Sequence, residues 1–396
     1  MSAVWEVPAH RRVRIFLFLL LVGCTSGTWV HAQTQESVLS DSLVVAWADE
    51  GLDHLYNFRF PEASVAFGRI EERYPQHPIA PFLDGLSIWW QIMPTMTVED
   101  HSHDRAFIRA MTRTADLADA LLKKDRSSFD GRFFRGAAHG FRGRLYSDRE
   151  EWLRAAQDGR RALNDIFDLS AADTTNADLV FGEGVYRYFA DAIPERYPIV
   201  RPLMLFFPSG DKEWGLEQLD RVVREGRFVR AEAAYFLLQI YTVFEPDVEK
   251  ASAYASLLTT WYPENPVFLA LEGRVAFRWG QWDRARALYT ELLEMDAPNA
   301  VLSQAHYYMG RLDMIDVSNE SALWHFQRVT ELESVYDGMS YFRVQSMLRE
   351  GMVHDVNGDR DAAVKAYERV RRLPDRGNSR DRAKQYLRSP YTRGAS

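Results

Sequence analysis

Two short runs of the sequence bring together side chains of the kinds that bind metal ions. One contains His101 and His103 between acidic residues, and residues 355–361 have the first oxygen-ligand spacings of a calcium-binding loop. No further histidine is tied to the first run by its spacing. The second has Arg360 where a calcium loop needs glycine and Ala366 where it needs an acidic ligand. We therefore interpret the first as a solvated loop and the second as a turn between helices, and we predict no metal and no other cofactor.

A cationic stripe stands out from the acidic remainder of the chain. Arg135, His139 and Arg142 recur at the helical spacings i, i+4 and i+7, and Arg144 follows two residues later. If this helix lines a concave surface, the stripe could bind an acidic peptide, a phosphate or a lipid headgroup. The alternative is pairing with acidic residues of neighbouring helices, for which three candidates are Glu150, Glu151 and Glu183. The sequence leaves both alternatives open.

The next predicted hairpin carries candidate neighbours of this stripe in a ligand-binding groove, namely Tyr186, Tyr188 and Asp191. The sequence contains no hydrolase motif, phosphate-binding loop, dinucleotide fingerprint or zinc-protease helix. We therefore expect a protein that is not an enzyme and has no catalytic residues.

The N-terminus has the pattern of an export signal. Three arginines precede the apolar run 15–22, which is too short to span a bilayer as a stable helix. Residues 1–32 are removed if a signal peptidase cuts after Ala32. Residues 1–23 are removed instead if the lipobox-like run ending at Cys24 is used, and Cys24 then carries the lipid. Both alternatives predict export, to the periplasm or the outer membrane of a Gram-negative-type bacterium.

The charge of the chain limits its partners. The net charge is −8, and either cleavage leaves 45 basic against 55 acidic residues. A nucleic-acid-binding protein needs a cationic face to displace counterions, so we expect no nucleic acid partner. Cys24 is the only cysteine, which excludes a disulfide within the chain. We also expect no transmembrane segment in the mature chain, so that its only membrane attachment would be a lipid at Cys24.

A frame of three residues recurs along the chain. Gly51, Ala63 and Phe67 are separated by 12 and 4 residues. The same spacings return in three further sets: Gly273, Ala285 and Tyr289; Gly310, Ala322 and Phe326; Gly351, Ala363 and Tyr367. The small residues let two helices approach closely, and the aromatic residue fills the gap to the next unit. This is the frame of the tetratricopeptide repeat, a pair of antiparallel helices in ~34 residues. The sequence therefore predicts an all-α fold, a right-handed superhelical solenoid of tetratricopeptide-type hairpins.

The frame also predicts how the chain is divided. After the leader, we expect a first repeat over 40–78, divergent helical hairpins with long loops over 79–227, repeats over 228–375, and a capping helix with a tail over 376–396. The cap is expected because a solenoid must shield its last apolar face.

The irregular middle resembles a known family. The run 182–191, GEGVYRYFAD, is followed by several prolines and then by FPSGDKEWGLEQL, residues 207–219. This succession is similar to a divergent tetratricopeptide family that includes exported bacterial proteins and eukaryotic relatives. The eukaryotic relatives are tied to mitochondrial outer-membrane, inclusion and lipid-droplet protein clearance. The family's recurring helix is matched at Gly210, Asp211, Lys212, Gly215, Leu216 and Leu219, with lysine where arginine is common. The resemblance covers residues 128–265 and implies the fold, but no catalytic residues.

These observations predict a non-enzymatic repeat scaffold of the bacterial cell envelope that binds a protein or peptide in its concave groove. One alternative is a carrier or sensor of a small amphiphile or lipid. Its pocket would be formed by aromatic residues of the middle region: Trp89, Trp90, Phe133, Phe134, Tyr186 and Tyr188. A second alternative is an enzyme with an unrecognised site. The sequence identifies neither the partner nor the oligomeric state.

Overall fold

The computed structural model of the protein describes residues 37–95, 100–198, 201–204, 207–333 and 340–393. Within these ranges the chain is helical, and none of the described residues lies in a strand. The all-α prediction is confirmed. The leader, both predicted cleavage positions and Cys24 lie outside the described residues. Among the helices described, none is both long and apolar enough to cross a membrane.

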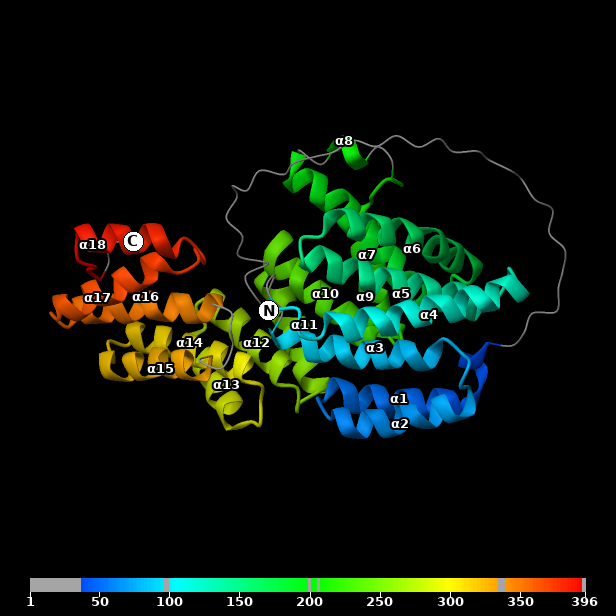
Figure 1. Ribbon diagram of the computed structural model, residues 1–396, viewed down its shortest axis with the longest axis horizontal. Helices are drawn as coiled ribbons and strands as arrows, with labels where there is room; N and C mark the ends of the chain where they lie inside the picture. The colour runs from blue at the N-terminus through cyan, green and yellow to red at the C-terminus, as the bar shows by residue number, and fades with distance from the viewer. Residues whose placement is uncertain (1–36, 96–99, 199–200, 205–206, 334–339, 394–396) are drawn as a thin grey trace.

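Eight pairs of helices follow one another in the described part of the chain (Figure 1). The first four pairs are α1 (Ser42–Tyr56) with α2 (Phe60–Arg73), α3 (Ile79–Ile92) with α4 (Asp104–Lys124), α5 (Phe129–Asp148) with α6 (Trp152–Ala172), and α7 (Ala177–Arg196) with α9 (Lys212–Glu225). The next four are α10 (Arg230–Gln239) with α11 (Val248–Trp261), α12 (Pro266–Arg278) with α13 (Trp282–Glu294), α14 (Asn299–Ile315) with α15 (Asn319–Leu332), and α16 (Tyr341–Val356) with α17 (Arg360–Arg372). Short elements complete the chain: η2 (Val38–Ser40), η3 (Met93–Thr95), α8 (Arg201–Met204), η5 (Ile240–Phe244) and the final helix α18 (Ser379–Arg388).

In four of these pairs, residues of the predicted frame form the packing contact between the two helices. In each, the glycine of the first helix lies directly against the aromatic ring of the second, as Gly51 against Phe67, Gly273 against Tyr289, Gly310 against Phe326, and Gly351 against Tyr367. A β-carbon added to Gly310 would lie 2.6 Å from the Phe326 ring. The frame alanines Ala63, Ala285, Ala322 and Ala363 are all fully buried. The prediction that these residues occupy equivalent positions is confirmed.

The first superhelical turn closes on itself. The Tyr56 hydroxyl at the end of α1 donates a hydrogen bond to Glu232 of α10. Asn265, just before α12, donates to the Tyr56 carbonyl oxygen at 2.7 Å. The rings of Trp90 in α3 and Phe268 in α12 meet edge to face, with centroids 5.3 Å apart. These contacts join residues far apart in sequence into one body, from which α13–α18 extend to one side (Figure 1).

The middle of the chain differs from the sequence prediction in two details. Gly136 and Gly140 are four residues apart in α5, and this spacing alone predicts that they form one strip for close helix packing. A β-carbon on Gly136 would lie 3.1 Å from Asp165 of α6, but one on Gly140 would meet nothing within 4 Å, so the second half of that prediction is wrong. Helix α7 also continues through Pro194 to Arg196 before the proline-containing segment begins.

Candidate functional site

The predicted cationic stripe on α5 is paired with carboxylates of the two adjacent second helices. Arg135 donates from Nε and Nη2 to Asp165 of α6, both at 2.7 Å, and from Nη1 to Asp119 of α4 at 3.0 Å. Arg142 donates to Asp158 of α6 at 2.5 and 2.7 Å. The stripe is therefore largely neutralised within the molecule.

His139 completes this network. Its Nδ1 lies 3.1 Å from Asp158 Oδ1, and both side chains are buried. Burial alone would raise the pKa of Asp158, but the hydrogen bonds from Arg142 and His139 outweigh it and hold that pKa well below its usual value. The structure thus shows the pairing alternative, although with aspartates of α4 and α6. Two of the glutamates named from the sequence pair elsewhere, Glu151 with Arg154 and Glu183 with Arg187.

The stripe also faces the second helices and not the opposite side of the first-helix row. Gly136, one residue after Arg135, lies against Asp165 of α6. Each helical residue turns by about 100°, so His139 and Arg142 point toward the same side as Arg135. That these residues bind a ligand stays a prediction, and any ligand there would compete with three carboxylates.

The remaining residues predicted for a groove lie apart from the stripe. Arg144 points to the other side of α5, with its guanidinium 4.8 Å from the ring centres of both Trp89 and Phe236. The Tyr186 hydroxyl donates to the Pro208 carbonyl oxygen at 2.7 Å. Asp191 accepts from the Lys212 amide at 3.2 Å, and Tyr188 is fully buried. The residues of α7 thus hold the segment before α9 in place.

The aromatic residues that the carrier alternative needs are mostly core. Trp89, Trp90, Phe134 and Tyr188 are each at most 2% exposed. Their rings pack on one another and on neighbouring helices, as in the contacts of Trp90 with Tyr235 and Phe268. Packing thus occupies these four side chains, and the carrier alternative stays a prediction.

The two runs with metal-ligand spacing also have structural partners. His101 Nδ1 lies 2.7 Å from Asp104, whose carboxylate accepts two hydrogen bonds from the buried Arg149 at 2.7 and 2.8 Å. Residues 355–361 span the end of α16 and the turn into α17, as predicted, with Gly358 at φ +81°. In the ranges that the structure describes, no three His, Cys, Asp or Glu side chains are arranged to hold a metal ion.

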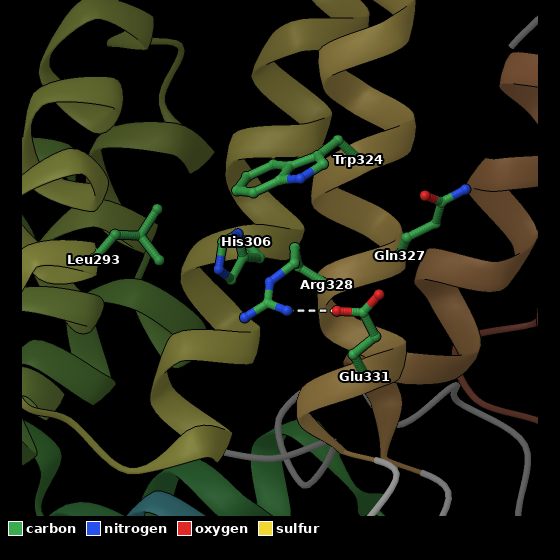
Figure 2. A pocket seen from close by; sticks show the side chains of 6 residues that line it. All are labelled: Leu293, His306, Trp324, Gln327, Arg328 and Glu331. Atoms are coloured by element: carbon green, nitrogen blue, oxygen red, sulfur yellow. Dashed lines mark hydrogen bonds and ion pairs between the residues drawn. The ribbon is translucent and has the colours of Figure 1, made fainter.

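A hollow that the sequence analysis missed lies on the outer surface between α13, α14 and α15. It has a volume of about 480 Å³, and its lining residues are Leu293, His306, Trp324, Gln327, Arg328 and Glu331. Figure 2 shows Trp324, His306 and Arg328 side by side, with Leu293 across from them. Trp324 is 53% exposed although it is a large aromatic residue.

The repeat frame explains why Trp324 is exposed. Ala322 and Phe326 of α15 are buried against α14, so the residue midway between them points away from that contact. Arg328 and Glu331 form an ion pair beside the ring. A tryptophan at this outward position of a repeat is a signal that could have been recognised in the sequence.

His306, which lines the hollow, belongs to a buried histidine pair. His306 Nδ1 lies 2.8 Å from His325 Nδ1, so one ring donates to the other. Burial, followed by the charges of His325 and Arg328, lowers the pKa of His306 to about 4. The His306 side of the hollow is therefore uncharged at neutral pH, while the Arg328–Glu331 ion pair also lines the hollow. This combination fits an apolar or aromatic side chain with polar groups at its edge.

Comparison with known proteins adds to this description only at the level of fold. No protein-family model matches the chain, and no curated protein matches it. Yeast Tom70 is 13% identical over 78% of this chain with a TM-score of 0.43, and the chain covers 63% of that protein. The human IFIT1 dimer with m7Gppp-AAAA is 14% identical over 80% of this chain and 68% of its own, with a TM-score of 0.47.

A tetratricopeptide repeat protein from Parabacteroides merdae is 12% identical over 74% of this chain and 94% of its own, with a TM-score of 0.33. These proteins are too distant to carry functional residues over. The assignment of the fold instead depends on the helix pairs of this chain and on the four glycine–aromatic contacts inside them. By that packing, the chain is a helical solenoid of tetratricopeptide type.

Proposed function

We propose that the protein is a non-enzymatic scaffold of a bacterial cell envelope that binds a partner protein or peptide. The observation that carries the proposal is the half-exposed Trp324 at the rim of a ready-made hollow. Tryptophan and arginine dominate the binding energy of many protein interfaces when they lie in a pocket that the partner can desolvate. Trp324 and Arg328 form such a pair on rigid, packed helices.

The cellular setting is part of the proposal and is supported by the leader pattern alone. An exported chain whose described part is a rigid stack of hairpins can present a surface without any cofactor. Binding then needs little rearrangement of the scaffold, because the walls of the hollow are already held by α13, α14 and α15.

A co-purification experiment tests the proposal. The full chain is expressed with a C-terminal tag so that its own leader is processed, and proteins retained from envelope extract are quantified. Trp324→Ala should weaken retention of the partner by about 30-fold, the effect expected for a hot-spot residue worth ~2 kcal/mol. Trp152→Ala is the matched control, because Trp152 is 62% exposed on α6 and does not line the hollow. The proposal fails if no protein is retained, or if both variants lose it equally.

A further inference from the structure

Contacts between residues far apart in the sequence close the first superhelical turn at one place. Tyr56, the last residue of α1, donates its hydroxyl hydrogen to Glu232 of α10, 176 positions further along the chain. The Tyr56 carbonyl oxygen accepts a hydrogen bond of 2.7 Å from the Asn265 side chain, just before α12. The Trp90 ring of α3 lies edge to face against the rings of Tyr56 and Phe268, with centroids 5.5 and 5.3 Å apart. We call these five residues the closure interface.

The buried centre of this interface, and not its edge, has to hold the turn closed. At the edge, Arg59 lies 3.7 Å from Glu264, and Arg227 lies 3.1 Å from Asp49. All four of these side chains are at least 34% exposed, and ion pairs of that kind contribute little in water. Each residue of the closure interface, in contrast, is at most 7% exposed. Closure of the turn therefore depends on the state of these buried groups.

Glu232 is the member of the closure interface whose charge can change near neutral pH. One of its carboxyl oxygens accepts the hydrogen bond from Tyr56, and the other, Oε2, is buried with no hydrogen-bond partner among the described residues. A neutral carboxyl group tolerates such a place better than an anion does, because an anion loses more solvation on burial. Tyr56 stays protonated and continues to donate, because burial raises its pKa well above the ordinary value of 10.

The charged and titratable groups that face Glu232 from neighbouring elements do not cancel the effect of burial. Arg144 of α5 favours the ionised carboxylate, but its guanidinium lies over three aromatic rings. Asp178 of α7 disfavours the carboxylate, and it accepts hydrogen bonds from backbone amides just before α10. Tyr262, between α11 and α12, faces Glu232 as a neutral phenol whose pKa is also raised by burial. Burial makes the largest contribution and raises the pKa of Glu232 to about 7.

We propose that the proton on Glu232 controls closure of the first superhelical turn, which is closed while this carboxyl group is neutral and opens when it ionises. In the open form, α1 and α2 lie apart from α10 and α12, and water solvates the Glu232 carboxylate. The hollow beside Trp324 is lined by residues of α13, α14 and α15, so this control does not depend on the proposed binding site.

The direction and size of the pH dependence follow from the difference between the two forms. The pKa of Glu232 is about 7 in the closed form and returns to its ordinary value of 4.5 when water reaches the carboxyl group. Its contribution to closure is therefore complete below pH 4.5 and is lost as the pH rises through about 7. Between about pH 5 and about pH 8, the ratio of open to closed molecules should rise about 70-fold.

Hydrogen exchange of the full chain, followed by mass spectrometry, tests this proposal. A single hairpin cannot bury its apolar face alone, so the amides of α1 and α2 should exchange whenever the turn opens. After correction for the intrinsic effect of pH on exchange, their protection should fall about 70-fold between about pH 5 and about pH 8. The pair α14–α15 is the internal reference, because it lies outside the closure interface, and its protection should change far less.

Three variants connect the effect to Glu232. Glu232→Gln should keep an acceptor for the Tyr56 hydroxyl and remove the pH dependence of exchange in α1 and α2. Tyr56→Phe removes the donor, so it should lower the protection of both helices at about pH 5 as well. Glu350→Gln is the matched control, because burial also raises the pKa of Glu350, which lies in α16 and pairs with Arg369. This control should keep the pH dependence of α1 and α2.

The possible results separate control of closure from a general effect on stability. Equal protection of α1 and α2 at both pH values, or a pH dependence that persists in Glu232→Gln, would overturn the proposal. An equal loss of protection in α14–α15 would also overturn it, because Glu232 would then affect unfolding of the whole chain. If Glu232→Gln does not fold, as judged by circular dichroism, the wild-type comparison of α1 and α2 with α14–α15 and the Tyr56→Phe variant still decide the matter.

Discussion

Replacing Gly310 by alanine should destabilise the pair α14–α15, the second helix pair from the C-terminal end of the stack, although the same change usually stabilises a helix. The new β-carbon would lie 2.6 Å from Cε1 of Phe326 and 2.9 Å from Cδ1 and Cζ. Phe326 is fully buried, so its ring cannot move aside without disturbing its neighbours. Overpacking of this kind costs about 1–3 kcal/mol.

The higher helix propensity of alanine acts in the opposite direction, and its contribution can be subtracted. Alanine in a helix interior is favoured over glycine by ~1 kcal/mol. Gly140→Ala in α5 supplies this reference, because its β-carbon would meet nothing within 4 Å. We therefore expect Gly140→Ala to stabilise the protein slightly, and Gly310→Ala to be less stable than that control by about 1–3 kcal/mol.

Urea unfolding followed by circular dichroism measures the difference in the free energy of unfolding. Hydrogen exchange of α14 and α15 then shows whether the loss is local, as expected when each hairpin contacts mainly its neighbours. If Gly310→Ala stabilised the protein as much as Gly140→Ala, close approach of the glycine to the ring would not be what determines this packing. That result would refute the physical explanation of the repeat frame.

Three further predictions concern titration and processing. Burial raises the pKa of Glu232 to about 7, so its contribution to stability is complete below its ordinary value of 4.5 and is lost as the pH rises through about 7. The change in the free energy of unfolding caused by Glu232→Gln should therefore be more favourable at about pH 8 than at about pH 4, by up to ~3 kcal/mol. Equal changes at both pH values would contradict this prediction. Burial lowers the pKa of His306 to about 4. The contribution of His306 to the free energy of unfolding is therefore complete above its ordinary value of 6.5 and is lost as the pH falls through about 4. An NMR titration of the His306 imidazole with a midpoint near 6.5 would contradict the burial of the histidine pair. The intact mass of the mature protein should correspond either to a chain that begins at Gln33 or to one with a lipid on Cys24, and an unprocessed mass would refute export.

The sequence by itself determined the class of fold and the positions of the repeats. Glycine, alanine and an aromatic residue at spacings of 12 and 4 reflect a local requirement, namely that two helices joined by a short turn must approach closely. Because both helices lie within one stretch of chain, the spacing alone was enough to pair Gly310 with Phe326 and Gly351 with Tyr367. The turn at residues 355–361 was predictable for the same reason.

Only the tertiary structure decided which surface each face of a helix meets. Helical spacing showed that Arg135, His139 and Arg142 share one side, but not that Asp158 and Asp165 of α6 lie against it. Closure of the first turn through Tyr56 was equally absent from local spacing. The physical reason is that helical periodicity fixes directions around a single axis. The neighbours found in those directions depend on how successive hairpins rotate relative to one another, which is a property of the whole stack.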